Sequence, residues 1–495
     1  MTRAHGAGGR LSPFPFHLLN WSVHLLNSWL VFWLLKRVWG STATEATRTD
    51  ANSAATAELA IRDLTTPGRV VWPALAGALF WGLHPLQAEA VGWATGFKDL
   101  GSAFFSLLSL YCFFRGVDGA CEATLSRARQ VLWTALATLA FLAALLAKPS
   151  AVTLPLAILT WLAFGPRSAH GTPPRNSLSW RLPAAWLILS ALLVVVSARV
   201  QSGGAPVLVS PWQRPFIASD ALAFYAQKTL WPVNLAMHYG RTPAKVLAGG
   251  HMALALVALI IVVASTVSAY RHQWRVPAWA LGTWVVFLLP VLGIVPFTYQ
   301  NLSTVADRYA YLALIGPALG ITWALGNAWR RPATTRLLWA LTCVWLLISG
   351  GLTLRQTAYW HSTRAMALHT LEVNPQSWVA ECLLGDIASH GGDFTGALAD
   401  YRKAMADNPH FARAFSAAGV ALAHLNRLDE ARATFLQASN IPYAPTDTRS
   451  VDDANLGMIA EIQGDPDAAR AFYAAALVFN PDDNNVRDRL NRLNH

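Results

Sequence analysis

Charged residues and paired cysteines are scarce in this chain of 495 residues. Only 13% of its residues are Asp, Glu, Lys or Arg, whereas a soluble domain carries about 25%. This composition argues against an ordinary cytosolic enzyme. The sequence has no glycine-rich phosphate loop, HExxH or GxSxG motif, and the chemistries that depend on them are not indicated. The four cysteines form no CxxC pair, which argues against a disulfide framework or a zinc site; they are Cys112, Cys121, Cys343 and Cys382.

Apolar residues, by contrast, are abundant. Hydrophobic residues make up 54% of the chain, with 22 tryptophans, and tryptophan gathers at membrane interfaces. The net charge of +11 could suggest nucleic acid. Its positive residues lie mostly in short loops between apolar runs, however, which favours a membrane surface and no nucleic-acid partner.

Ten apolar segments between Phe16 and Leu354 predict membrane-spanning helices. Each supplies much of the stretch of about 20 residues that a helix needs to cross a bilayer, and none alternates with a period of two, as barrel strands would. The segment Ser219–Leu235 is interrupted by Asp220 and Lys228 and is interpreted as an interfacial helix. The ten segments are Phe16–Leu35, Val70–Leu86, Leu100–Phe114, Val131–Ala147, Ser150–Gly165, Leu182–Ala198, His251–Tyr270, Val276–Gln300, Tyr309–Trp329 and Leu337–Leu354.

Basic residues are distributed unevenly between the two sets of loops. With ten crossings, sixteen Lys and Arg lie in the loops on one side and ten in those on the other. The positive-inside rule places the richer set in the cytoplasm and the C-terminal region outside it. We therefore expect a multi-pass protein of a bacterial inner membrane, with its C-terminal region on the periplasmic side.

The C-terminal region repeats itself every 34 residues. Gly385 and Gly419 are 34 apart, as are Tyr401 and Phe435, and Gly457 belongs to a third copy after a four-residue insertion. Small residues at helix contacts, an aromatic residue that fills the gap and a proline after the second helix are typical of tetratricopeptide repeats. The sequence thus predicts an all-α chain with a membrane domain at 1–355, a connecting helix at 356–373 and three repeats at 374–495.

Four polar groups interrupt the apolar pattern on the predicted outer side. One of them surrounds the interfacial segment and is explained largely by contact with the membrane surface; it consists of Tyr225, Lys228, His238, Tyr239 and Arg241. The first contains His84, Glu89, Lys98 and Asp99, and Glu89 could act as a base or position a hydroxyl or cation. Its structural alternative is a turn in which Glu89 pairs with Lys98. The second is Lys148, which could bind a phosphate or extend to the membrane surface.

The third polar group is Asp307-Arg308-Tyr309. Arg308 could hold a lipid phosphate, and the alternative is a helix cap at Asp307 beside an interfacial aromatic belt. A cluster of His17, Asn20 and His24 is better explained by helix packing than by metal binding, and no metal site is predicted.

The order of these motifs resembles the transmembrane and tetratricopeptide-repeat O-mannosyltransferases and their bacterial relatives in the GT-C superfamily. The resemblance rests on His84-Pro85, Glu89-Ala90-Val91, Lys98-Asp99, Lys148 and Ala306-Asp307-Arg308-Tyr309, followed by the repeats. It implies a GT-C-like membrane domain and an inverting transfer of sugar from a polyprenyl-phosphate donor, on the non-cytoplasmic face. Family members also have a helix and an acidic catalytic loop upstream of the region matched here, and we expect that loop to precede Met1.

Two functions remain open at this level. In the first, the resemblance assigns Glu89 and His84 to the acceptor or base, and Arg308, Lys148 and Lys98 to the donor phosphate, with support from Asp99, Asp307 and Tyr309. The repeats would then present protein acceptors. In the second, the chain is a non-catalytic membrane scaffold that gathers protein partners. No cofactor is implied beyond the lipid-linked sugar, and the sequence leaves any need for a divalent metal open.

Overall fold

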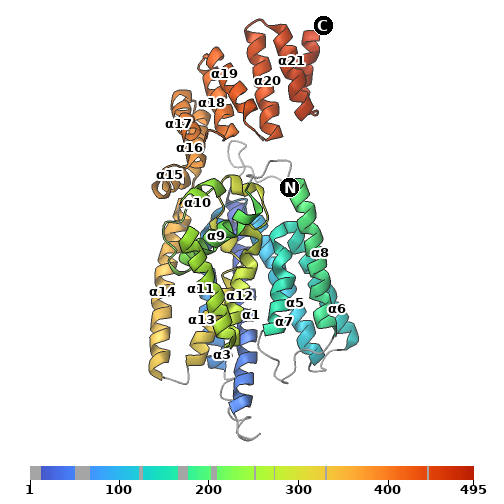
Figure 1. Cartoon of the computed structure of the whole chain (residues 1–495), viewed down its shortest axis with the longest axis vertical. Coiled ribbons are helices and arrows are strands. Elements are labelled where there is room, and N and C mark those ends of the chain that lie inside the picture. The colour runs from blue at the N-terminus through green and yellow to red at the C-terminus, as the bar shows by residue number, and fades with distance from the viewer. Residues whose placement is uncertain are drawn as a thin grey trace. The chain divides into compact units, whose positions relative to one another are not determined.

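The computed structural model describes residues 13–50, 67–121, 126–164, 177–201, 209–249, 252–271, 274–328, 332–442 and 445–494. Every regular element in these ranges is helical (Figure 1). The contacts divide the helices into two compact units: α1 to α14 form the first, and the chain from His361 onward, together with Ala236–Gly240, forms the second. Three ends of predicted spans, Gly165, His251 and Trp329, lie outside the described residues.

Helices of the first unit occupy the predicted apolar segments. Within the described ranges, five of them are long and apolar enough to cross a membrane: Phe14–Thr42 of α1, Phe97–Val117 of α5, Arg127–Ala147, Ser179–Ser197 of α8 and Pro332–Tyr359. The full bounds are α1 Phe14–Asp50, α3 Pro67–Gly82, α4 Ala88–Gly92, α5 Phe97–Cys121, α6 Arg127–Ala147, α7 Leu154–Phe164, α8 Ser177–Gln201, α9 Arg214–Leu230, α10 Pro243–Ala248, α11 Met252–Arg271, α12 Arg275–Leu288, α13 Ile315–Asn327 and α14 Pro332–Tyr359.

The predicted continuous helix over Val276–Gln300 is wrong in its second half. Helix α12 ends at Leu288, and a short 3₁₀ turn, Leu289–Val291, follows with Pro290 near its start. Proline cannot donate the backbone hydrogen bond that a continuing helix needs. Gly293 then adopts φ +85°, a conformation that favours glycine. The chain therefore turns away from the helix axis before reaching the site.

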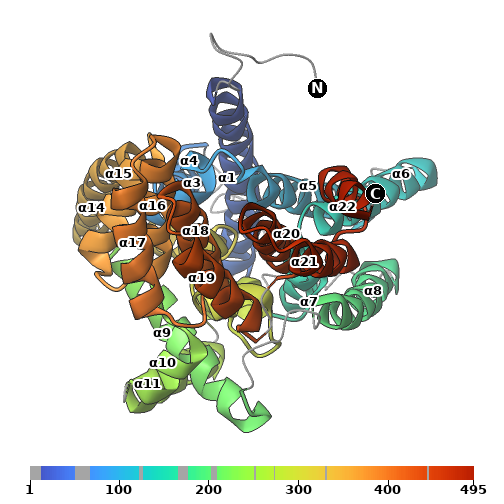
Figure 2. The same ribbon diagram turned by 90° about the horizontal axis from the view of Figure 1, so that it is seen from above.

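Glycines allow several helices of the first unit to approach closely. A Cβ at Gly77 of α3 would lie 2.6 Å from the carbonyl oxygen of Ala318 on α13, and one at Gly316 would lie 2.4 Å from that of Ala280 on α12. A Cβ at Gly326 would overlap the ring of Trp39. Figure 2 shows α9, α10 and α11 together at one edge of this unit and α14 beside α3 and α4.

The second unit is a stack of antiparallel helix pairs. Its helices are α15 Thr363–Val373, α16 Trp378–His390, α17 Phe394–Asp407, α18 Ala412–His424, α19 Leu428–Asn440, α20 Thr446–Ile462, α21 Pro466–Phe479 and α22 Asn484–Asn494. The predicted connecting helix at 356–373 is divided in the structure, because α14 continues to Tyr359 and α15 begins at Thr363.

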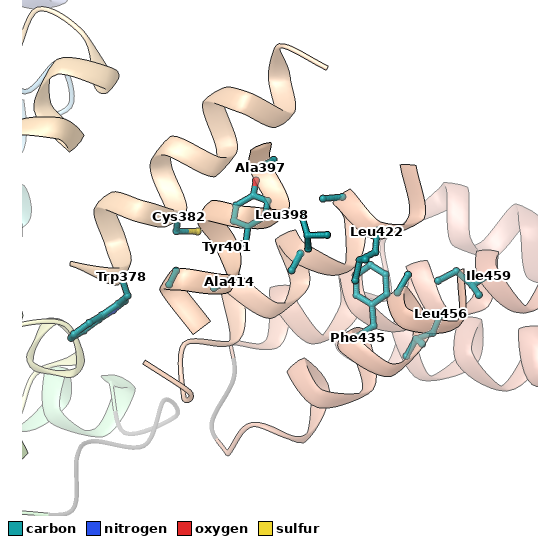
Figure 3. Packing of buried hydrophobic residues seen from close by; sticks show 14 residues of the cluster. Trp378, Cys382, Ala397, Leu398, Tyr401, Ala414, Leu422, Phe435, Leu456 and Ile459 are labelled. Carbon is teal, nitrogen blue, oxygen red and sulfur yellow. The ribbon is translucent and has the colours of Figure 1, made fainter. Parts of the chain in front are cut away.

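The repeat in the sequence corresponds to a repeated contact in the structure, in which a glycine of one helix packs against an aromatic ring of its partner helix. A Cβ at Gly385, Gly419 or Gly457 would lie 2.5–2.7 Å from the ring of Tyr401, Phe435 or Tyr473. Each ring is buried and fills the space between the two helices of its pair. Tyr401 and Phe435 lie within the continuous core from Trp378 to Ile459 shown in Figure 3. These glycines are therefore core positions, as the repeat pattern predicts.

Candidate functional site

Glu89 and Arg308 form a buried ion pair between two segments that are 219 residues apart. Glu89 lies in the first turn of α4, and Arg308 lies in the 3₁₀ helix Asp307–Ala310. The backbone N–H of Arg308 donates to Glu89 Oε2 at 2.8 Å, and its guanidinium donates to Oε1. Glu89 is 2% exposed and Arg308 is 8% exposed. Both oxygens of Glu89 are thus engaged by Arg308, and the alternative pairing of Glu89 with Lys98 does not form in the described structure.

Three aromatic rings surround the guanidinium of Arg308. Its central carbon lies 4.5 Å from the ring centre of Tyr299, 5.0 Å from that of Tyr309 and 5.3 Å from that of Trp93. A cation over an aromatic face is attracted by the ring quadrupole, more strongly where water is excluded. This cage fixes Arg308 in position while its further N–H donors retain the capacity to bind a second group.

A second ion pair, between Lys148 and Asp99, lies beside the first. Lys148 is the residue between α6 and the 3₁₀ turn Pro149–Thr153, and its ammonium also lies 5.0 Å from the ring centre of Tyr309. Asp99 is buried, and its Oδ2 has no hydrogen-bond partner within the described residues. Lys148 retains 19% exposure of its side chain. This pair therefore combines a reachable cation with an unsatisfied acceptor.

A small cavity of about 30 Å³ lies between these groups. Its polar lining residues are Asp99, Ser102, Lys148, Ser150, Arg308, Tyr309 and Tyr311. This volume is enough for about one water molecule. Four of the predicted site residues, Asp99, Lys148, Arg308 and Tyr309, thus converge on one cavity, and Glu89 is joined to it through Arg308.

His84, Lys98 and Asp307 have other surroundings. Both ring nitrogens of His84 are engaged, one with Thr229 O at 3.1 Å and one with the N–H of Leu86 at 3.2 Å. Lys98 is exposed and lies 5.9 Å from the ring centre of Trp93. None of these three lines the cavity.

The alternative of a helix cap at Asp307 is not what the structure shows. Ala306 occupies the cap position of the 3₁₀ helix, and Asp307 is its first residue. Asp307 is buried and interacts electrostatically with Lys228. It therefore belongs to the polar surroundings of α9 as much as to the segment that carries Arg308.

Sequence reasoning did not identify the roles of Lys228 and Asp220. Lys228 is buried in α9, and its ammonium donates to the carbonyl oxygens of Val233 at 2.6 Å and Asn234 at 3.1 Å, just beyond the end of the helix. Asp220 pairs with Arg241 at 2.5 Å. The only available signal was charge inside an apolar run, which cannot reveal the partner.

The cluster of His17, Asn20 and His24 includes two residues that pack helices together. His24 contacts the hydroxyl of Tyr311 at 2.8 Å and the carbonyl oxygen of Gly82 at 3.1 Å. Asn20 donates to the carbonyl oxygen of Trp93 at 2.8 Å. Within the described residues, no group of three or more His, Cys, Asp or Glu is arranged to hold a metal ion.

No curated protein matches the chain. Among solved structures, one from the functional characterisation of Pseudomonas aeruginosa PilF is 26% identical, with a TM-score of 0.25 over 26% of this chain and 58% of that one. The Cut9–Hcn1 hetero-tetramer of the APC/C is 12% identical, with a TM-score of 0.28 over 93% of this chain and 96% of that one. At these TM-scores, neither similarity carries an argument.

Family comparison identifies the repeats directly. Two tetratricopeptide-repeat families match, one at residues 382–445 and the other at 454–483. These ranges contain all three glycine–aromatic contacts described above. The second unit of this chain is therefore built from tetratricopeptide repeats.

Proposed function

We propose that the first unit is a membrane glycosyltransferase-like domain that binds a polyprenyl-phosphate sugar, and that the repeats hold its protein acceptor. The observation that carries the proposal is the convergence of Glu89, Asp99, Lys148, Arg308 and Tyr309. The same unit contains helices that are long and apolar enough to span a membrane. In this proposal the site and the repeats lie on the non-cytoplasmic side of a bacterial inner membrane.

The two ion pairs have different roles in the proposed reaction. Lys148 is the more exposed cation and binds the donor phosphate as a point charge. Arg308, held by Glu89 and three rings, presents its remaining donors to the same phosphate. An acceptor hydroxyl attacks the anomeric carbon, the bond from that carbon to the phosphate oxygen breaks, and a carboxylate takes the hydroxyl proton. Of the carboxylates here, Asp99 has an unengaged oxygen, whereas Glu89 must first be released by Arg308.

Binding of radiolabelled polyprenyl-phosphate mannose to the full chain in lipid nanodiscs tests this proposal. Lys148→Gln removes a charge-assisted contact worth about 1.5–3 kcal/mol, which corresponds to a loss of affinity of roughly 10- to 100-fold. Lys98→Gln removes the same charge from an exposed residue outside the cavity and is the matched control. If both variants lost affinity equally, the effect would be due to the general charge of the surface and not to a phosphate site at Lys148. Undiminished binding by the Lys148 variant would refute the phosphate site.

A membrane-anchored scaffold is the second candidate, and one observation favours it. Both oxygens of Glu89 are engaged by Arg308, as in a pair that serves stability alone. Tetratricopeptide repeats are a fold suited to protein–protein interaction, and here they are confirmed. In this case the full chain would capture the same partners from a membrane extract with or without Lys148→Gln, and it would transfer no sugar to a hydroxyl-bearing peptide.

A further inference from the structure

The residues that precede Asp307 and Arg308 are buried without regular secondary structure. Residues 303–306 are each 0% exposed and lie between the 3₁₀ helices Thr298–Asn301 and Asp307–Ala310. Ala306 is extended, with φ −153° and ψ 145°. Almost every buried backbone N–H and C=O in a folded protein has a hydrogen-bond partner. Since no helical ladder supplies these partners along this stretch, other residues must, and those residues decide where Arg308 lies.

Tyr225 of α9 satisfies both backbone polar groups of Ala306. Its hydroxyl accepts from the N–H of Ala306 at 3.1 Å and donates to the carbonyl oxygen of the same residue at 3.1 Å. One hydroxyl can do both because it carries a donor and two lone pairs. The sequence pattern attributes Tyr225 to contact with the membrane surface, whereas the structure leaves it 0% exposed. A buried side chain of α9 therefore fixes the chain shortly before Arg308.

Two further side chains of α9 act on the same segment. The backbone N–H of Thr304 donates to the carbonyl oxygen of Arg241 at 2.8 Å, and the guanidinium of Arg241 pairs with Asp220 of α9. Asp307 interacts electrostatically with Lys228, which is also in α9. Helix α9 thus holds the whole segment by hydrogen bonds and by charge.

The contacts of Tyr225 differ from those of Glu89 in how a bound phosphate affects them. Glu89 accepts from the guanidinium of Arg308 as well as from its backbone N–H. A phosphate at this guanidinium therefore competes with Glu89 for the same donors. The hydrogen bonds of Tyr225 go to the backbone of Ala306 and do not involve the guanidinium. They persist when the phosphate binds, and they keep Arg308 in place while its donors turn to the ligand.

Recognition of a phosphate by arginine depends on this placement. The guanidinium presents its donors in a rigid fork, and paired contacts to two phosphate oxygens require that fork to be correctly aimed. A distant change that misplaces a group by about 1 Å can cost roughly 10²-fold in rate. We infer that Tyr225 is a positioning residue for the donor phosphate, which it does not touch, and that it acts through residues 303–306 on Arg308. This inference rests on the proposed function.

Donor binding to the full chain in maltoside micelles tests the inference. Tyr225→Phe keeps the ring and removes both hydrogen bonds to Ala306. We expect it to lower the affinity for polyprenyl-phosphate mannose roughly tenfold, since Arg308 is displaced but still present. Tyr401→Phe is the matched control. It removes the hydroxyl of another buried tyrosine, which donates to Asp386 at 3.0 Å in the repeats, and it should bind the donor as wild type does.

A comparison across two backgrounds separates positioning from stability alone. In the Arg308→Lys background, which keeps the charge and loses the fork, Tyr225→Phe should cost less than about twofold more, because the two residues act as one unit. In the Lys148→Gln background it should still cost roughly tenfold, because Lys148 pairs with Asp99 and not with this segment. Phosphorus NMR gives a second reading, since maltosides contain no phosphorus. The resonance of the bound donor should move in Tyr225→Phe toward its position in Arg308→Lys.

Two results would overturn the inference. In one, Tyr225→Phe costs no more affinity than Tyr401→Phe; in the other, it costs as much in the Arg308→Lys background as in wild type. If Tyr225→Phe fails to fold, Ser303→Ala decides in the same comparison, because the Ser303 hydroxyl bonds to the backbone of Val305 within the segment. Unchanged affinity in Ser303→Ala then overturns the inference.

Failure of the inference can be told apart from failure of the proposed function. Donor binding that depends on Lys148 and not on Tyr225 overturns the inference alone and leaves the phosphate site standing. Absence of donor binding by the wild-type chain overturns both. Loss of affinity in Tyr225→Phe that disappears in the Arg308→Lys background, with Tyr401→Phe unchanged, supports both.

Discussion

Removing one partner of the Glu89–Arg308 pair should destabilise the first unit strongly. Glu89→Gln preserves the size of the side chain and leaves one oxygen to accept the backbone N–H of Arg308. It removes the negative charge that compensates the buried guanidinium. Arg308→Met does the converse and leaves a buried carboxylate without its cation.

The magnitude follows from the burial of both groups. Breaking a buried pair by removing one partner costs about 3–5 kcal/mol. Because Gln retains an acceptor and the aromatic cage still stabilises the cation, we expect Glu89→Gln at the lower end, about 3 kcal/mol. We expect the cost of Arg308→Met to lie near the upper end of this range, at about 5 kcal/mol. The double variant Glu89→Leu/Arg308→Met replaces both charges with apolar groups and should recover most of the loss, since such replacements are often neutral or stabilising.

The assay is equilibrium unfolding of the full chain in mixed micelles, and it compares the free energy of unfolding of wild type with that of Glu89→Gln. The same assay compares the single variants Glu89→Leu and Arg308→Met with their double variant. This cycle isolates the interaction between the two side chains. Asp386→Asn is the control, because Asp386 pairs with Arg413 at the surface of the repeats, where such a pair is worth at most about 1 kcal/mol. If the single variants cost less than the control, and the double variant costs their sum, then Glu89 and Arg308 do not form a buried pair.

Three further predictions concern the repeats and the topology. Gly419→Val should cost about 1–3 kcal/mol by overpacking against Phe435, and Phe435→Leu in the same chain should recover part of it in thermal unfolding; no cost would contradict the close contact. Burial raises the pKa of Glu381, which also lies near Asp407, and of Asp452 to about 7 each, so the folded repeats favour the protonated forms. Protonation contributes its full stability at pH values below the unfolded pKa values near 4, and this stability is lost as the pH rises through 7. The thermal unfolding midpoint of residues 361–495 should therefore be lower at pH 8 than at pH 5. The difference should be smaller in the Asp452→Asn variant. A reporter that fluoresces only in the cytoplasm, fused after His495, should stay dark, whereas a bright fusion would contradict the positive-inside assignment.

The parts of the fold that could be predicted are those encoded by local periodicity. The repeats follow from the 34-residue spacing of Gly385 and Gly419, because each glycine faces a ring within its own helix pair. The apolar helices could be predicted in the same way, from the length of the uninterrupted apolar segments. The break in the helix after Leu288 depends instead on how the chain must turn at Gly293 to reach the site. An average of hydropathy over this stretch does not reveal the break.

The sequence predicts which charged residues belong to this cluster, but it does not predict how they pair. Glu89, Asp99, Lys148 and Arg308 stood out as charges in apolar surroundings, because burying them unpaired is costly. Which cation meets which carboxylate depends on tertiary contacts across 49 and 219 residues, and nothing local distinguishes Lys98 from Arg308 as the partner of Glu89.

The close glycine contacts within the first unit also bear on how this sequence can drift over generations. On α14, exposed apolar residues such as Leu347 and Leu354 can exchange with Ile, Val or Phe at little cost, because they touch no fixed neighbour on that face. At Gly77, Gly316 and Gly326 even alanine would need neighbouring backbone or a large ring to move. Sequence variation should therefore accumulate on the outer faces of the helices and stop at these three points. Among related chains, they would serve as fixed markers for aligning helices whose remaining residues have become interchangeable.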